Sequence, residues 1–139
     1  MIKLESNYIE KLRKSGLRPT KQRIKICEVL FNREKTFHFS ISELTKIIRL
    51  QFNEKISLAT VYNTVHAFQK KGYLKEISIG NDMSYFDTNT VSHHHFYDAN
   101  TNELIDINSH EVEIKKTPTP PSGKKIDDIE VTFKISKKI

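Results

Sequence analysis

In the first half of the chain, hydrophobic positions recur three or four residues apart, the spacing of one face of an α-helix. Each run is bounded by residues that begin or end helices, such as Ser40 with Glu43, which have the spacing of a capping box. Four short amphipathic helices are therefore predicted. They cover 6–15, a segment opening at Pro19-Thr20, a segment opening at Ser40, and a segment from Ser57 to Gly72. Their apolar positions are Tyr8, Ile9, Leu12, Ile24, Cys27, Val29, Leu30, Phe31, Leu44, Ile47, Ile48, Phe52, Val61, Val65 and Phe68.

After Gly72 hydrophobic and polar residues alternate, which is typical of β-strands. A hairpin is predicted from 73–79 and 83–87, with its turn at Gly80-Asn81-Asp82. Further strands are predicted at 93–98, 103–107 and 129–135, and the prolines at 118, 120 and 121 interrupt the pattern between the last two.

Helices followed by a hairpin indicate a winged helix-turn-helix, and the strands beyond it indicate a second domain. The expected fold class is α+β: a winged helix-turn-helix over residues 1–88, then a small α/β dimerisation domain over 89–139 with an antiparallel three-stranded sheet. Three short strands make a poor core alone, so a homodimer that buries one face of the sheet is expected.

The charge of the chain is divided unevenly between these two parts. The protein has 139 residues and a net charge of +6, but residues 1–83 carry 16 Lys+Arg against 8 Asp+Glu, and the remainder carries 7 against 9. A basic winged helix is typical of a protein that binds double-stranded DNA. The fourth helix would read bases through Ser57, Thr60, Tyr62 and Asn63. Phosphate or minor-groove contacts are expected from Arg18, Lys21 and Arg23.

The cysteine count and the hydropathy narrow the class of protein. A single cysteine, Cys27, excludes an intrachain disulfide and a cysteine-rich zinc site within one chain, and it is expected to be a core side chain. No apolar run approaches membrane-spanning length, and the N-terminus has no signal-peptide core, so a cytoplasmic protein without a membrane partner is expected.

Three of the six histidines are consecutive, at His93, His94 and His95. In a strand, alternate side chains share a face, so His93 and His95 would point together and His94 away. Two imidazoles on one strand face form a chelate, and the sequence therefore predicts a metal site. A zinc hydrolase could use the same ligands, but no general base lies beside the run, so an enzyme is not expected.

Three segments carry a resemblance to a known family. The segments 16–23 (GLRPTKQR) and 58–62 (LATVY), together with the histidine run followed by Leu104-Ile105-Asp106, resemble the ferric uptake regulator (Fur) superfamily. Asn63 and the Pro118-to-Gly123 segment are closest to its iron response regulator (Irr) branch. The resemblance implies a dimeric regulator of iron and haem genes that binds palindromic operators. It also implies one regulatory site for Fe²⁺, Mn²⁺ or Zn²⁺, with the ligands His38, Asp87, His93, His95 and Asp106.

Departures from the family pattern are informative as well. Asp98 and Thr101 stand where many relatives have the first Cys-x-x-Cys pair, so the four-cysteine structural zinc is expected to be absent. The Irr branch is associated with haem, which makes His93, His94 and His95 candidate haem ligands, whereas Cys27 precedes Glu28 and does not form the branch's Cys-Pro motif. A conventional Fe²⁺- or Mn²⁺-corepressed sensor without a haem response, and a metal-independent DNA-binding protein, are the alternatives.

Overall fold

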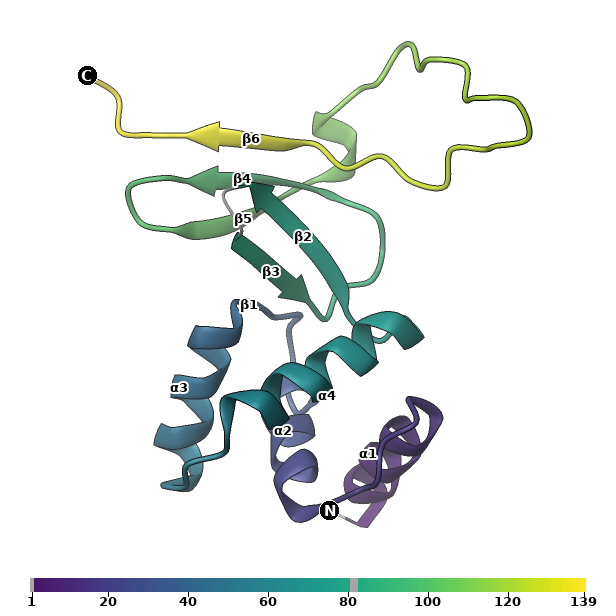
Figure 1. Ribbon diagram of the computed structural model, residues 1–139. Helices are drawn as coiled ribbons and strands as arrows, with labels where there is room; N and C mark the ends of the chain where they lie inside the picture. The colour runs from purple at the N-terminus through teal and green to yellow at the C-terminus, as the bar shows by residue number, and fades with distance from the viewer. Residues whose placement is uncertain (1, 81–82) are drawn as a thin grey trace. The chain divides into compact units, whose positions relative to one another are not determined.

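The chain folds into two compact units, Met1–Thr90 and Val91–Ile139, each with its own three-stranded sheet (Figure 1). The computed structural model describes residues 2–80 and 83–139. The first unit contains α1 (Ile2–Lys14), α2 (Lys21–Phe31), β1 (His38–Phe39), α3 (Ile41–Phe52), α4 (Leu58–Lys71), β2 (Lys75–Gly80) and β3 (Met83–Asp87). The second contains β4 (His94–Asp98), β5 (Glu103–Ile107), the 3₁₀ turn η1 (Ser109–Glu111) and β6 (Thr132–Ile135).

Side-chain caps fix where three of the helices begin. The hydroxyl oxygens of Thr20, Ser40 and Ser57 each accept a hydrogen bond from the backbone N–H three residues later, at 3.3, 3.1 and 3.1 Å. Gly72 ends α4 in the left-handed conformation, with φ +95°. These boundaries agree with the sequence prediction, but α1 begins at Ile2, before the predicted start at residue 6.

The core of the first unit is formed where the four helices pack on one another and on the hairpin of β2 and β3. Its fully buried side chains include Leu12, Ile26, Leu30, Leu44, Ile48, Val61, Val65 and Phe68. Phe31 packs edge to face on Phe68, with ring centroids 5.6 Å apart. Ile26 belongs to the core although its helix pattern did not identify it, whereas Ile47 and Phe52 are only partly buried.

Cys27 lies inside this core, as expected, and burial raises the pKa of its thiol to about 12. Because the thiolate is the reactive form, we expect iodoacetamide to label Cys27 at neutral pH only in molecules that have unfolded. The labelled fraction, measured by mass spectrometry across a urea series, should follow the unfolding curve. Rapid labelling of the native protein would show that the thiol is accessible.

The sheet of the first unit has the order β1-β3-β2, with antiparallel pairing throughout. The hairpin of β2 and β3 is the predicted wing, and the predicted turn residues Asn81 and Asp82 lie outside the described residues. The two-residue strand β1 is an addition to the prediction. It pairs His38 with Asp87 and Phe39 with Phe86.

The sheet of the second unit has the order β5-β4-β6. Pairing of β4 with β5 is antiparallel, as predicted, but β6 runs parallel to β4, so the prediction of an antiparallel sheet is wrong for its third strand. The reason is the connection from 108 to 131, which contains only η1 and otherwise irregular chain, and which returns the chain to the starting end of β4. None of the helices among residues 2–80 and 83–139 has the length and apolar character needed to span a bilayer.

Candidate metal centre and nucleic-acid interface

Two imidazoles converge on one carboxylate in the second unit. His95 of β4 stands opposite Asp106 of β5 in the strand register, so the two side chains share a face of the sheet. The Nε2 atoms of His95 and His93 lie 3.1 and 3.3 Å from Oδ1 of Asp106. One potential ligand atom from each of the three residues lies within 4.8 Å of the others. Three donors this close can hold a single ion.

The orientation of the His93 ring suits a metal ligand. Its Nδ1 lies 2.6 Å from the carbonyl oxygen of Val91. Because a carbonyl oxygen only accepts hydrogen bonds, Nδ1 must carry a proton, so in the neutral form of the ring the lone pair lies on Nε2, the nitrogen nearer to Asp106. A backbone acceptor behind the ring is the usual outer partner of a ligating histidine. This carbonyl left no signal in the sequence, because every residue has one.

His94 has a different environment from its two neighbours. It pairs with Ile107, on the face of the sheet opposite to His95 and Asp106. Its Nδ1 accepts a hydrogen bond of 2.9 Å from the backbone N–H of Val131, just before β6. The proton of a neutral His94 ring is therefore on Nε2. A metal or haem iron could bind this Nε2 only if the ring gave up its bond to Val131.

The other two predicted ligands are directly opposite each other in the first unit. His38 and Asp87 are register partners of β1 and β3, so their side chains leave the sheet on the same face. Asp87 is fully buried, and its Oδ1 accepts a hydrogen bond of 2.8 Å from the backbone N–H of Asn89. His38 is partly buried. The short strand β1 is thus what brings these two residues together.

The donor set restricts the kinds of metal that fit. His93 and His95 offer imidazole nitrogen, and Asp106 offers carboxylate oxygen, and no cysteine is part of this cluster among the described residues. Such mixed nitrogen and oxygen ligands suit Fe²⁺, Mn²⁺ and Zn²⁺. Asp98, where the family resemblance implies a cysteine in many relatives, organises the turn between β4 and β5 by accepting hydrogen bonds from the backbone N–H groups of Asn100 and Thr101.

The predicted base-reading residues lie in the first two turns of α4, and the structure divides them by role. Ser57 caps the helix, and its hydroxyl lies 2.8 Å from that of Thr60, so both hydroxyls are already engaged locally. Tyr62 is 49% exposed and packs on His66, with ring centroids 4.5 Å apart. Asn63 is exposed. Of the four predicted base-reading residues, Tyr62 and Asn63 are therefore the two that are exposed and take no part in the helix cap.

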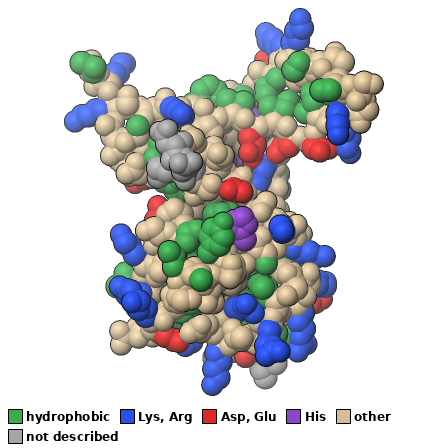
Figure 2. Space-filling model, viewed as in Figure 1, with side chains coloured by type: hydrophobic (Ala, Val, Ile, Leu, Met, Phe, Trp, Pro, Cys, Tyr) green, Lys and Arg blue, Asp and Glu red, His purple; other side chains and the backbone are tan. Residues whose placement is uncertain are grey.

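The predicted phosphate contacts lie around the start of α2. Arg18 and Lys21 are exposed, whereas Arg23 is partly buried and its guanidinium donates to the carbonyl oxygen of Arg18 at 2.9 Å. That bond fixes the Arg18 backbone beside the helix N-terminus. Figure 2 shows further Lys and Arg side chains, in blue, over the helices of this unit.

Comparison with known proteins identifies the family from the sequence. The sequence model of the ferric uptake regulator family matches residues 14–134. The ferric uptake regulation protein of Pseudomonas fluorescens is 34% identical over 103 residues, which cover 73% of this chain and 82% of that protein. The peroxide operon regulator of Bacillus subtilis is 33% identical over 99 residues, which cover 71% of this chain and 66% of the relative.

Solved structures show the same fold at lower identity. The ferric uptake regulator of Pseudomonas aeruginosa, solved with manganese, superposes with a TM-score of 0.67 at 24% identity, covering 95% of this chain and 98% of that one. The Helicobacter pylori regulator, described as having three functional metal-binding sites, gives 0.69 at 21% identity, covering 96% and 91%. With a winged helix-turn-helix, a histidine and aspartate cluster and a match over most of its length, the chain belongs to the ferric uptake regulator family.

Proposed function

We propose that this protein is a homodimeric, metal-responsive transcriptional regulator that binds palindromic operators of iron and haem metabolism genes. The observation that carries the proposal is the convergence of His93 and His95 on Asp106 in a chain whose other unit is a basic winged helix-turn-helix. A DNA-binding unit joined to a metal-ligand cluster has the parts that a metal-dependent regulator needs. Because its partner would be chromosomal DNA, we expect it to act in the cytoplasm.

The metal would be the signal that changes DNA binding. We propose His38, Asp87, His93, His95 and Asp106 as the ligands of one ion, of which the first two belong to the first unit and the other three to the second. An ion with ligands from both units would restrict their motion relative to each other. The solved Pseudomonas aeruginosa relative contains manganese, which supports Mn²⁺ as one candidate beside Fe²⁺ and Zn²⁺.

Haem is a second candidate effector, which the run of three histidines suggests. His93 and His95 face Asp106, and Nδ1 of His94 accepts the N–H of Val131, so in this conformation all three rings have partners within the protein. Haem ligation would have to displace one of these contacts. A non-haem ion uses the rings as they stand, and for that reason we favour it. Haem binding through His93, His94 or His95 stays a prediction from the sequence.

The exposed face of the second sheet supports a homodimer. Phe96 stands beside Ile105 on one neighbouring strand and beside Phe133 on the other, which places three apolar side chains in a row across the sheet. Ile105 and Phe133 are each 42% exposed. A second copy of the chain would cover this row and supply the second DNA-binding unit that a palindrome requires.

Operator binding by protein stripped of metal is the experiment that tests the proposal. A duplex would first be recovered by selection from a random DNA pool with Mn²⁺-loaded protein. Its affinity would then be measured for the metal-free protein and after addition of Fe²⁺, Mn²⁺, Zn²⁺ or haem, each separately. We expect a large change in affinity with at least one of the three ions. An operator affinity that does not change on addition of any of the three ions or of haem would favour the metal-independent alternative.

Base reading by Asn63 gives a more specific prediction. Asn63→Ala should cost about 1–3 kcal/mol of operator affinity per half-site and relax the preference at one position in each half-site, because a side-chain amide that pairs with a base edge is lost. Affinities for a set of duplexes, each with one base pair substituted, would measure this. Asn7→Ala, an exposed asparagine on α1, is the control. An unchanged preference profile for Asn63→Ala would remove this residue from base reading.

A further inference from the structure

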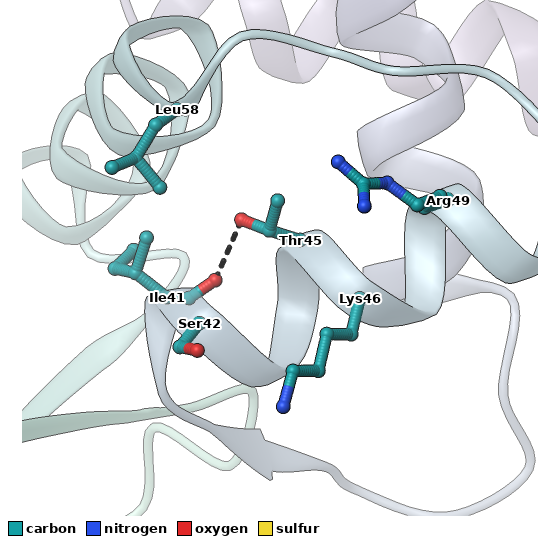
Figure 3. Close-up of a pocket in the computed structure, with 6 residues that line it drawn as sticks. All are labelled: Ile41, Ser42, Thr45, Lys46, Arg49 and Leu58. Carbon is teal, nitrogen blue, oxygen red and sulfur yellow. Dashed lines mark hydrogen bonds between the residues drawn. The ribbon is translucent and has the colours of Figure 1, made fainter.

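A basic groove lies along α3, outside the residues discussed so far (Figure 3). Its volume is about 410 Å³. Lys46 and Arg49 extend from α3, and Leu58, the first residue of α4, stands across from them. The complete lining is Ile41, Ser42, Thr45, Lys46, Arg49 and Leu58. The groove therefore joins the two helices of the helix-turn-helix.

The lining of the groove combines two cations with an apolar side chain, which suits an anionic ligand that also has carbon-rich parts. Lys46 and Arg49 are three residues apart on one helix, so they share a face, and both are exposed. Among the described residues, no carboxylate lies within ion-pair distance of either. Leu58 is 61% exposed and offers apolar contact beside the two cations. Thr45 donates its hydroxyl to the carbonyl oxygen of Ile41, which holds the wall of the groove in place.

A neighbouring groove on the same unit differs from this one in the charge of its lining. It has a volume of about 480 Å³, shares Ile41 and Ser42 with the first, and extends to the wing. Its lining includes Glu76, whose carboxylate accepts a hydrogen bond of 2.9 Å from Ser84, and it contains no lysine or arginine. A carboxylate repels a phosphate, so of the two grooves only the one along α3 is complementary to a polyanion.

The position of the groove indicates which polyanion would enter it. In helix-turn-helix proteins the helix that precedes the recognition helix crosses the DNA backbone, while the N-terminal part of the recognition helix meets the bases. α3 and α4 have these two positions, and the groove opens between α3 and the first residue of α4. A duplex read by Asn63 would therefore bring its sugar–phosphate backbone past Lys46 and Arg49.

We propose that this groove seats the DNA backbone, with Lys46 and Arg49 each contacting a phosphate and Leu58 packing against the intervening sugar. The proposal rests on the proposed DNA-binding function and assigns it two further contact residues. These contacts would fix the position of the protein along the duplex, and they would not distinguish one base sequence from another.

The test is the salt dependence of DNA binding by the double variant Lys46→Gln/Arg49→Gln. The slope of log affinity against log salt should become shallower by about 3.6 for the dimer on its palindrome, since the variant removes two phosphate contacts from each protomer and each contact contributes about 0.9. The loss of affinity should be the same for the selected operator and for its base-substituted versions. Because both side chains are exposed, the melting temperature should stay that of the wild type.

The matched control is Lys70→Gln/Lys71→Gln, which removes the same charge at the far end of α4. It should keep the wild-type slope. The proposed contact with the DNA backbone is refuted if the Lys46→Gln/Arg49→Gln variant keeps that slope. It is also refuted if the slope of the control falls by as much as that of the groove variant. Saturable binding of inorganic phosphate to the wild type that disappears in the groove variant would also overturn the proposal, in favour of a small-anion site. Wild-type protein that shows no salt-dependent DNA binding would instead refute the proposed function itself.

Discussion

Replacing His93 and His95 together by alanine is expected to abolish the response of DNA binding to Fe²⁺, Mn²⁺ and Zn²⁺. The two Nε2 atoms lie 3.3 and 3.1 Å from Asp106, so the double variant removes two of the three donors that the second unit brings together. Loss of a group that merely supports a ligand costs about 10–100-fold in metal affinity, and loss of two ligands should exceed the upper figure. Metal titration by calorimetry and operator binding with and without metal would measure both effects.

His110→Ala is the matched control, because this histidine is exposed on η1. It should leave metal affinity and the metal response unchanged. The helical content of the His93→Ala/His95→Ala variant should also equal that of the wild type, because its helices belong to the first unit. A double variant that responds to all three metals as the wild type does would contradict the metal site.

A charge placed in the apolar row of the second sheet is expected to separate the dimer. Phe133 packs on Phe96 with ring centroids 5.9 Å apart and remains 42% exposed, so Phe133→Asp should leave a carboxylate that a second copy cannot cover. The variant should sediment as a monomer at micromolar concentration. Its operator affinity should fall by about 10²–10⁴-fold, because the two half-sites are no longer bound by tethered modules.

Lys137→Gln provides a control with the same change in charge, −1, at an exposed residue just beyond β6. It should remain dimeric and keep its operator affinity within a small factor. A wild-type protein that is monomeric at micromolar concentration, or a Phe133→Asp variant that still sediments as a dimer, would exclude this face as the interface.

Helix boundaries were predictable from the sequence because their causes are local. Thr20, Ser40 and Ser57 accept hydrogen bonds only three residues away, and Gly72 adopts a conformation that depends on its own lack of a side chain. The strand β1 has no such local cause. Two residues become a strand only because β3, far along the chain, offers them a free edge, and no pattern around His38 indicates that pairing.

The same distinction separates the parts of the candidate metal centre. The common direction of His93 and His95 follows from alternation along one strand, and the convergence of both on Asp106 agrees with it. The prediction of Asp106 as a ligand rested on the family resemblance. The distance between Asp106 and the two histidines depends on the hairpin register that pairs it with His95, which the local sequence does not reveal. The hydrogen bonds of His93 to Val91 and of Val131 to His94 involve backbone groups, which the identity of a residue does not reveal.

The parallel pairing of β6 also sets the order in which the protein can mature during synthesis. β4 is complete at Asp98 but obtains its second neighbour only when Thr132–Ile135 has been made, whereas every element of the first unit precedes residue 90. Contacts between segments so distant in sequence form late, because the intervening loop must close first. We therefore expect the DNA-binding unit to fold while the chain is still attached to the ribosome, and the dimer to assemble only after the last strand has emerged.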